Sequence, residues 1–251
     1  MTTTTHVTYI GGPTVVLEYA GCRILIDPTF DAPGHYPEAG LTKTAGPGIP
    51  ASVVEPVDAV LLSHHAHADN LDTTGREFAM NAPVVLSTPE AEAELGSPVV
   101  GMRPWQTYRL GDVTITALPG SHGPRIMRPL IGPVTGFMLS APGEPSVFVS
   151  GDNSSLALIR ESAKRLGGAD LAVLFAGAAR VMPLPAALTL TSQKAVEAAR
   201  IMRARHVVGA HVEDWAHFSQ SRADLEKAFA DAGLADALLT TPRGERVAIP
   251  H

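Results

Sequence analysis

Three histidines and an aspartate lie within six residues of one another, in the stretch Ser63-His64-His65-Ala66-His67-Ala68-Asp69-Asn70. Imidazole nitrogens and carboxylate oxygens are common ligands of zinc, manganese and iron in proteins. Side chains at alternate positions, as in His65, His67 and Asp69, can converge on one point if the backbone is extended or turning. The types and the spacing of these residues therefore predict a metal site.

Four more residues that can bind a metal follow apolar segments elsewhere in the chain, namely Asp27, His122, Asp152 and His211. An apolar segment that stops at a polar residue is typical of a buried strand that ends at the edge of a sheet. In layered α/β folds that edge is where active sites assemble. We therefore expect these residues to join the stretch 63–70 in one site, held between several loops.

The remaining pattern predicts the elements that must position this site. Strands are predicted over 6–10, 14–19, 22–27, 57–63, 84–87, around 99, 113–118, 134–140, 147–150, 171–175, 207–209 and around 247. Helices are predicted over 71–80, from residue 88 onward, over 156–166, over 192–203 and around 225–232, and long Gly/Pro-rich loops over 28–50, 119–133 and 175–188. Each half has strands first and helices later. This order favours an α+β fold in which two mixed sheets pack together with helices on the outer faces, a four-layer αββα sandwich.

Length and composition limit the remaining choices. With 251 residues and 45% hydrophobic residues, the chain can bury a large core, and we expect one domain over residues 1–251. It has neither a signal-peptide pattern nor an apolar run near the ~20 residues that cross a bilayer, so we expect a soluble, cytoplasmic protein without membrane contact. The single cysteine, Cys22, excludes an internal disulfide. A net charge of −6 without a basic block argues against nucleic acid as a partner. Whether copies form a homo-oligomer is left open.

Five segments in one order resemble the metallo-β-lactamase-fold superfamily, in particular the branch related to L-ascorbate 6-phosphate lactonase. The resemblance covers almost the whole chain, and five motifs in the right order are far more specific than any one of them. The segments are Thr14–Glu18 with Asp27–Phe30, Ser63–Asp72, Ser121–Pro124, Ser150–Asn153 and Trp215–Phe218.

The resemblance implies a set of metal ligands. His65, His67 and His122 would bind a first ion, Asp69 and His211 a second, with Asp152 between the two ions. Asp27 would hydrogen-bond a ligand and fix its orientation.

Two departures from the family's HxHxDH pattern leave alternatives open. Asn70 stands where the pattern has its last histidine, and an amide is a poorer ligand for a transition metal. One extra residue lies between Ser63 and Asp69, so either His64 or His65 is the first ligand. We prefer His65 because it keeps the spacing to His67 and Asp69, with His64 and Asn70 as the alternates.

These residues predict a hydrolase that uses one or two divalent ions, with zinc as the first choice and manganese or iron as alternatives. The pKa of a metal-bound water falls to about 7, so that it can attack a small ester, lactone or phosphoester. If only one ion binds, Asp69 would orient this water or accept its proton, and His211 or His217 would stabilise the developing oxyanion. If two ions bind, Asp69 is a ligand and Asp152 lies between the ions.

The substrate is expected to be a small molecule, with an anionic group as one option. Arg125, Arg128 and Arg180 lie in the Gly/Pro-rich loops, where guanidinium groups could hold a phosphate or a carboxylate. Two other functions are weighed against hydrolysis of a small molecule. One is a metal-binding scaffold that has lost catalysis and serves as a sensor or binding module, and the other is a phosphodiesterase or nuclease.

Overall fold

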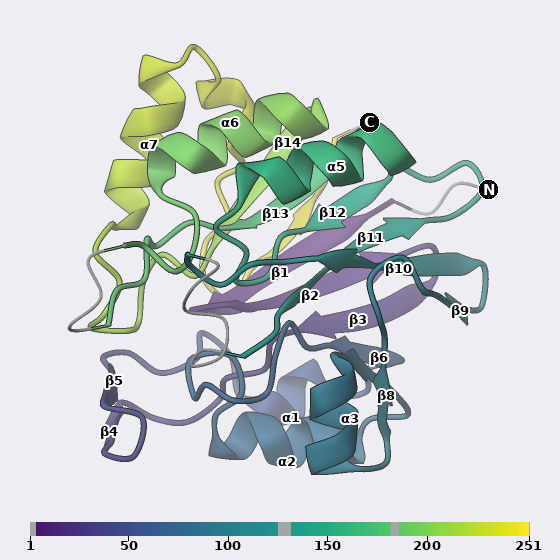
Figure 1. The fold of residues 1–251 in the computed structure, drawn as a ribbon, viewed down its shortest axis with the longest axis vertical. Helices are drawn as coiled ribbons and strands as arrows, with labels where there is room; N and C mark the ends of the chain where they lie inside the picture. Colours follow the sequence, from purple (N-terminus) through teal and green to yellow (C-terminus); the bar gives the residue numbers. More distant parts are fainter. Residues whose placement is uncertain (1–3, 125–131, 182–185, 251) are drawn as a thin grey trace.

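Two β-sheets pack face to face in the computed structural model, which describes residues 4–124, 132–181 and 186–250 (Figure 1). The first sheet has the strand order β15-β1-β2-β3-β6-β7-β8. Its strands are β1 (His6–Gly11), β2 (Thr14–Tyr19), β3 (Cys22–Ile26), β6 (Ala59–Leu61), β7 (Val85–Ser87), β8 (Val99–Gly101) and β15 (Arg246–Ala248).

The second sheet has the strand order β14-β13-β12-β11-β10-β9. Its strands are β9 (Thr107–Leu110), β10 (Val113–Pro119), β11 (Thr135–Ser140), β12 (Val147–Val149), β13 (Leu171–Phe175) and β14 (His206–Ala210). Both sheets are mixed, because antiparallel hairpins in each lead into parallel strands such as β3 beside β6 and β13 beside β14.

Helices cover the outer face of each sheet. On the first sheet lie α1 (Ala51–Val54), α2 (Thr73–Asn81) and α3 (Pro89–Leu95), and on the second lie α5 (Leu156–Leu166), α6 (Ser192–Met202) and α7 (Arg222–Asp231), as Figure 1 shows. A short 3₁₀ turn, η2 (Ala235–Ala237), follows α7.

Three apolar clusters fill the spaces between these layers. The central cluster lies between the sheets and includes the fully buried Leu17, Leu61, Phe137 and Val173. The other two clusters pack α1 to α3 against the first sheet and α5 to α7 against the second. The predicted four-layer αββα sandwich is confirmed.

The ends of the predicted helices follow from their local sequence. Thr88 caps α3 by accepting a hydrogen bond from the Ala91 N–H, with Pro89 at the first helical position, where proline fits best. Ser221 and Asp224 form a capping box at the start of α7. The α5 helix stops at Gly167, as its sequence indicates.

The long loops hold more structure than their composition indicates. The segment 28–50 contains a hairpin of β4 (Gly34–Tyr36) and β5 (Leu41–Lys43), and α1 follows it. β9 was also absent from the predicted strands. These elements have three or four residues each, and β4 and β9 are largely exposed, so no apolar periodicity marks them.

The parallel strands explain why residues far apart in sequence meet. Asp27, Asp152 and His211 stand one to three residues beyond the carboxyl ends of β3, β12 and β14, and His64 stands beyond that of β6. Parallel strands of one sheet present these ends at the same edge, so the two packed sheets bring the four residues together. Within the described ranges, no helix has the length and apolar character needed to cross a membrane.

Candidate metal centre

Three histidine rings converge at the edge where the two sheets meet. The Nδ1 atom of His67 lies 2.8 Å from His64 Nε2 and 3.3 Å from His122 Nε2. His64 and His122 are buried, and His67 is partly buried. Within this group each residue offers one nitrogen, and all of these nitrogens lie within 4.8 Å of one another.

Hydrogen bonds on the far side of two of these rings fix their protons. The Ser63 hydroxyl donates to Asp27 Oδ2, so its oxygen accepts from His64 Nδ1, 3.2 Å away. The carbonyl of Leu188 accepts from His122 Nδ1 at 2.9 Å. In both rings Nε2 therefore carries a lone pair directed at the cluster, which is the arrangement of metal-binding histidines.

The preference for His65 over His64 as the first residue of this cluster was wrong. His65 Nε2 lies 2.9 Å from Glu94 Oε2, on the exposed side of α3, and His65 is not among the converging rings. The chain turns directly after β6, so the alternation of an extended strand, on which the preference relied, does not hold there. His64 takes the inner position.

This geometry predicts different outcomes for two neighbouring alanine variants. His64→Ala should lose most of the metal bound at the three-histidine cluster, because it removes one of three converging nitrogens. His65→Ala should keep the metal, since the polar contact it removes is with the exposed Glu94 and not with the cluster. Metal content of the purified variants by mass spectrometry checks this, and a His65→Ala protein without metal beside a loaded His64→Ala protein would contradict it.

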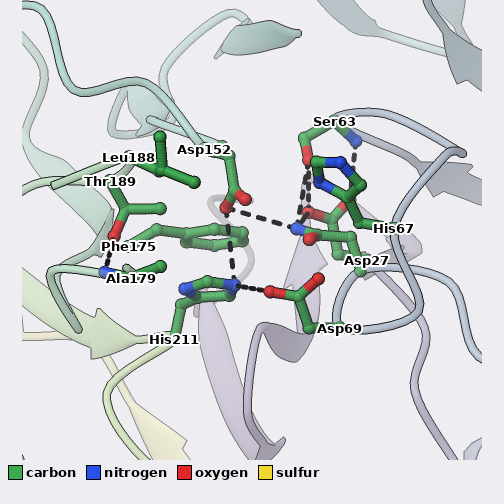
Figure 2. Close-up of polar contacts among 12 residues, drawn as sticks. Asp27, Ser63, His67, Asp69, Asp152, Phe175, Ala179, Leu188, Thr189 and His211 are labelled. Atoms are coloured by element: carbon green, nitrogen blue, oxygen red, sulfur yellow. Dashed lines mark hydrogen bonds and ion pairs between the residues drawn. The ribbon is translucent and has the colours of Figure 1, made fainter. Parts of the chain in front are cut away.

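A second group of ligand atoms, from Asp69, Asp152 and His211, lies next to the first, and all three residues are buried. His211 Nε2 lies 3.2 Å from Asp69 Oδ2 and 3.5 Å from Asp152 Oδ1. The other oxygen of Asp152, Oδ2, lies 3.4 Å from His122 Nε2 in the histidine cluster. Asp152 thus faces both groups, and Figure 2 shows its carboxylate turned toward His211.

Asp27 lies beneath these groups. Its carboxylate accepts hydrogen bonds from the Ser63 N–H and hydroxyl, both at 2.6 Å, and from Asn70 Nδ2 at 2.9 Å. We expected Asp27 to hydrogen-bond a metal ligand directly. Among the described contacts, Ser63 lies between Asp27 and His64, so Asp27 orients His64 through the Ser63 hydroxyl. Burial raises the pKa of Asp27 to about 7, against the hydrogen bonds from Ser63 and Asn70.

His217 also points into the site. Its Nε2 lies 2.9 Å from Asp69 Oδ2, the oxygen that His211 also contacts. The ring of Phe175 stacks on His211 at 5.3 Å with an interplanar angle of 4°, and Phe218 lies on His211 at 4.1 Å. These two aromatic rings fix the orientation of the buried imidazole of His211.

Unusual backbone conformations occur at the ends of the site strands. Asp27 and His211 have positive φ values of 38° and 56°, which non-glycine residues rarely adopt. At Gly151, with φ of 52°, a Cβ atom would stand 2.6 Å from the Thr135 carbonyl oxygen and 2.8 Å from Ser63 Cβ. The Gly-Asp pair thus lets the backbone approach closely enough for Asp152 to reach both groups.

The pKa shifts of His64, His67 and Asp69 favour metal binding. Burial, with the neighbouring imidazoles adding to it, holds the pKa of His64 well below its ordinary value, and burial also lowers the pKa of His67. Both rings are therefore neutral near pH 7, the form that binds a metal. Burial opposes the charge of Asp69, but hydrogen bonds from His211 and His217 hold its pKa well below the usual range. For His211 the carboxylates of Asp152 and Asp69 outweigh burial and raise the pKa.

The predicted arginines are less closely tied to the site. Arg180 is exposed, its Nε donates to Ser219 Oγ at 3.1 Å, and its backbone N–H donates to the His217 carbonyl at 3.0 Å. It therefore lies beside the segment that carries His217. Arg125 and Arg128 lie outside the described residues.

Comparison with known families agrees with this arrangement. A family model described as the beta-lactamase superfamily domain matches residues 22–212, which is more than half of the chain. The chain belongs to the metallo-β-lactamase superfamily. The match begins at β3 and ends just after His211, so it spans the site residues from Asp27 to His211.

Named members of the superfamily resemble this chain over different lengths. A "UPF0173 metal-dependent hydrolase" of Xanthobacter autotrophicus is 28% identical over 174 residues, which cover 62% of this chain and 66% of that protein. The crystal structure of a possible metal-dependent hydrolase from Veillonella parvula superposes with a TM-score of 0.87 at 19% identity, over 98% of this chain and 100% of that one. The crystal structure of an isothiocyanate hydrolase from Delia radicum gut bacteria superposes with a TM-score of 0.84 at 22% identity. This match covers 97% of this chain and 98% of that one. The two structures show the fold that this metallo-β-lactamase superfamily member shares with them.

The donor set of this superfamily member fits a divalent ion. Three imidazole nitrogens converge in one group, and two carboxylates with one imidazole converge in the other. Asp152 Oδ2 is fully buried and has no hydrogen-bond partner among the described residues, although buried carboxylate oxygens normally have one. A cation between the two groups would satisfy it.

Sequence reasoning missed several residues that hold the ligands in place. Ser63 and the Leu188 carbonyl orient His64 and His122, and Phe175 stacks on His211. Ser63 adjoins the histidine stretch, so its position gave a signal. Leu188 and Phe175 gave no such signal. Every residue has a backbone carbonyl, and an apolar residue in a strand is expected in the core whether or not it contacts a site.

Proposed function

We propose that this chain is a metal-dependent hydrolase that acts on a small molecule with an ester, lactone or phosphoester bond. The observation that supports this most is the convergence of His64 Nε2, His67 Nδ1 and His122 Nε2 beside a carboxylate that faces both groups. The name of the Xanthobacter autotrophicus relative supports the same reaction class. The resemblance to the L-ascorbate 6-phosphate lactonase branch favours a lactone as the first substrate to test.

The site residues have separate proposed roles. A divalent ion bound there, with zinc the first choice and manganese or iron as alternatives, supplies a Lewis acid and lowers the pKa of water to about 7. In the two-ion case His64, His67 and His122 would hold the first ion, and Asp69, Asp152 and His211 would hold the second, with Asp152 facing both groups. If only the first ion binds, the ionised Asp69 carboxylate would instead orient the attacking water or accept its proton, and His211 or His217 would stabilise the developing oxyanion.

Removal and return of the metal tests this function. The purified protein is analysed for metal, stripped with a chelator, and assayed on lactones, aryl esters and bis(p-nitrophenyl) phosphate. We expect hydrolysis of at least one of these compounds to be lost on stripping and restored by zinc, manganese or iron(II). Bound metal without turnover would favour the binding scaffold, and absence of both metal and metal-stimulated turnover would exclude the proposed hydrolase.

We propose that Arg180 contacts an anionic group of the substrate, since it is exposed and borders the segment of His217. Arg180→Ala should raise KM for an anionic substrate about tenfold or more, because hydrogen bonds to charged groups contribute about 1.5–3 kcal/mol. The kcat value and the KM for a neutral ester should change little. Steady-state kinetics check this, with Arg160→Ala, at an exposed arginine of α5, as the matched control. An equal rise in KM for both substrates would argue against the proposed contact.

A further inference from the structure

Position 70 does not supply a nitrogen ligand in this chain. The Asn70 Nδ2 atom faces Asp27 Oδ2 at 2.9 Å and Asp152 Oδ1 at 3.3 Å, and it donates to both. An amide N–H₂ group has donors only, so the atom turned toward the two carboxylates cannot bind a cation. The second group of ligands thus contains Asp69, Asp152 and His211 without a histidine from position 70.

A histidine from another segment contacts Asp69 of this group. His217 follows His211 by six residues, beyond β14, and its Nε2 lies 2.9 Å from Asp69 Oδ2. The Nε2 atom of His211 approaches the same oxygen at 3.2 Å. Two imidazole nitrogens therefore converge on one carboxylate oxygen, one from the residue directly after β14 and one from the loop that follows.

The surroundings of His217 give its ring no other polar role. Its Nδ1 is buried and has no hydrogen-bond partner among the described residues, so the polar contact of the ring is at Nε2. Phe218 packs edge-on against the ring at 4.7 Å, and Trp215 lies 6.2 Å away. The side chain is 11% exposed, and its polar contact is with Asp69.

We propose that His217 is a ligand of the second metal ion, together with Asp69, Asp152 and His211, in place of the histidine that the HxHxDH pattern has at position 70. This inference rests on the proposed metal-dependent function. Two carboxylates and two imidazoles are a donor set that suits zinc, manganese and iron(II). The absence of a histidine at position 70 then leaves a two-ion site intact, and the Asn70 Nδ2 group serves as a hydrogen-bond donor to Asp27 and Asp152.

The segment that carries His217 is fixed by contacts outside the site. Trp215 is buried and pairs through its backbone with Lys43 of β5, and Tyr36 of β4 packs on its ring at 5.4 Å. The Arg180 N–H donates to the His217 carbonyl. These contacts hold the backbone on both sides of His217, so the imidazole is positioned before any ion binds.

Metal content of four proteins tests the assignment without reference to activity. The wild type and the variants His217→Ala, His217→Gln and His35→Ala are loaded with zinc, dialysed and analysed by mass spectrometry, and cobalt-loaded samples are compared by visible absorption. Glutamine keeps an N–H that can donate to Asp69 but is a poor ligand for these ions. His35 is an exposed histidine of the β4–β5 hairpin and serves as the matched control.

We expect two ions per chain in the wild type and in His35→Ala, and one ion in both variants of His217, with the cobalt spectrum of the remaining ion retained. Two ions in His217→Ala would overturn the assignment. Two ions in His217→Gln alone would also overturn it, because the hydrogen bond to Asp69 would then be what matters. Loss of both ions in both variants would show that His217 supports the whole metal centre and is not specific to the second ion. This result would also overturn the assignment.

The failure of this inference can be told from the failure of the proposed function. A wild type with one ion, lost in His64→Ala, would leave the hydrolase proposal standing and remove the second site. A wild type without any metal would overturn both.

Discussion

Asp152→Asn is expected to lower metal affinity more than about 100-fold and to abolish turnover, since the loss of an outer partner of a ligand alone costs 10–100-fold. Asp152 is the residue whose two oxygens face the two ligand groups, at 3.4 Å from His122 Nε2 and 3.5 Å from His211 Nε2. Asparagine has nearly the same shape, so the change removes charge and one ligand oxygen without opening a cavity.

The physical reason is that one substitution acts on both groups. An amide in place of Asp152 would put a donor next to His122 or His211, and the centre would lose one of its two negative charges in the second group. Desolvated cations need compensating charge, because burial of an unpaired charge is very costly. The effect should therefore exceed that of any single histidine variant in the first group.

Metal titration monitored by calorimetry, followed by assay of the loaded protein, measures both effects. The matched control is Asp231→Asn, at an exposed residue of α7 that forms a surface ion pair with Lys227. That variant should bind metal and turn over substrate as the wild type does. Wild-type affinity in Asp152→Asn would show that the carboxylate is not a ligand.

Asp72→Ala is expected to destabilise the fold by about 3–5 kcal/mol, the usual loss when one partner of a buried ion pair is removed. The Lys43 ammonium lies 2.8 Å from Asp72 Oδ2, and the two side chains are 2% and 0% exposed. The same carboxylate accepts hydrogen bonds from the backbone N–H groups of Phe30, Asp31 and Gly75. Alanine would leave a buried ammonium without its carboxylate and three N–H groups without their acceptor.

Unfolding in urea measures this change, with a chelator present so that metal binding does not contribute. Thr88→Ala is the comparison, because Thr88 also caps a helix but accepts a single hydrogen bond, from Ala91. Loss of such a cap costs about 0.5–2 kcal/mol. A loss of stability in Asp72→Ala no larger than that in Thr88→Ala would show that the Lys43 pair contributes nothing to the fold.

Asp72 also connects stability with the site. It caps α2, which begins four residues after Asp69, and it holds Lys43 of the β4–β5 hairpin. The ammonium of Lys43 lies 5.6 Å from the centre of the Trp215 ring, and Trp215 is two residues from His217. The stretch 63–72 therefore contributes candidate ligands and, through Asp72 at its end, holds Lys43. Lys43 in turn lies against Trp215, close to His217.

Sequence periodicity predicted the layers of the fold because most strands and helices are long enough to show it. The strands of 14–19 and 171–175 and the helix of 156–166 have the predicted bounds, since buried faces and caps are local features. The β4–β5 hairpin could not be predicted in this way. Its strands have three residues each, and Lys43 is buried through its pairing with a distant aspartate.

The sequence by itself determined which residue types stand at the ends of the strands, because apolar segments and the polar residues that follow them can be recognised directly in the sequence. The inventory of Asp27, His67, His122, Asp152 and His211 follows from it, and the structure brings these residues to one edge. It also determined that Asn70 departs from the family's pattern.

Only the tertiary structure decided which neighbouring side chains point inward. The turn after β6 directs His64 to the cluster and His65 to Glu94 of α3, and this choice depends on Ser63 and Asp27 beneath the turn. The approach of His217 to Asp69 likewise depends on the loop after β14. Side-chain direction in irregular segments is set by distant packing and hydrogen bonds, and no spacing rule in the sequence encodes it.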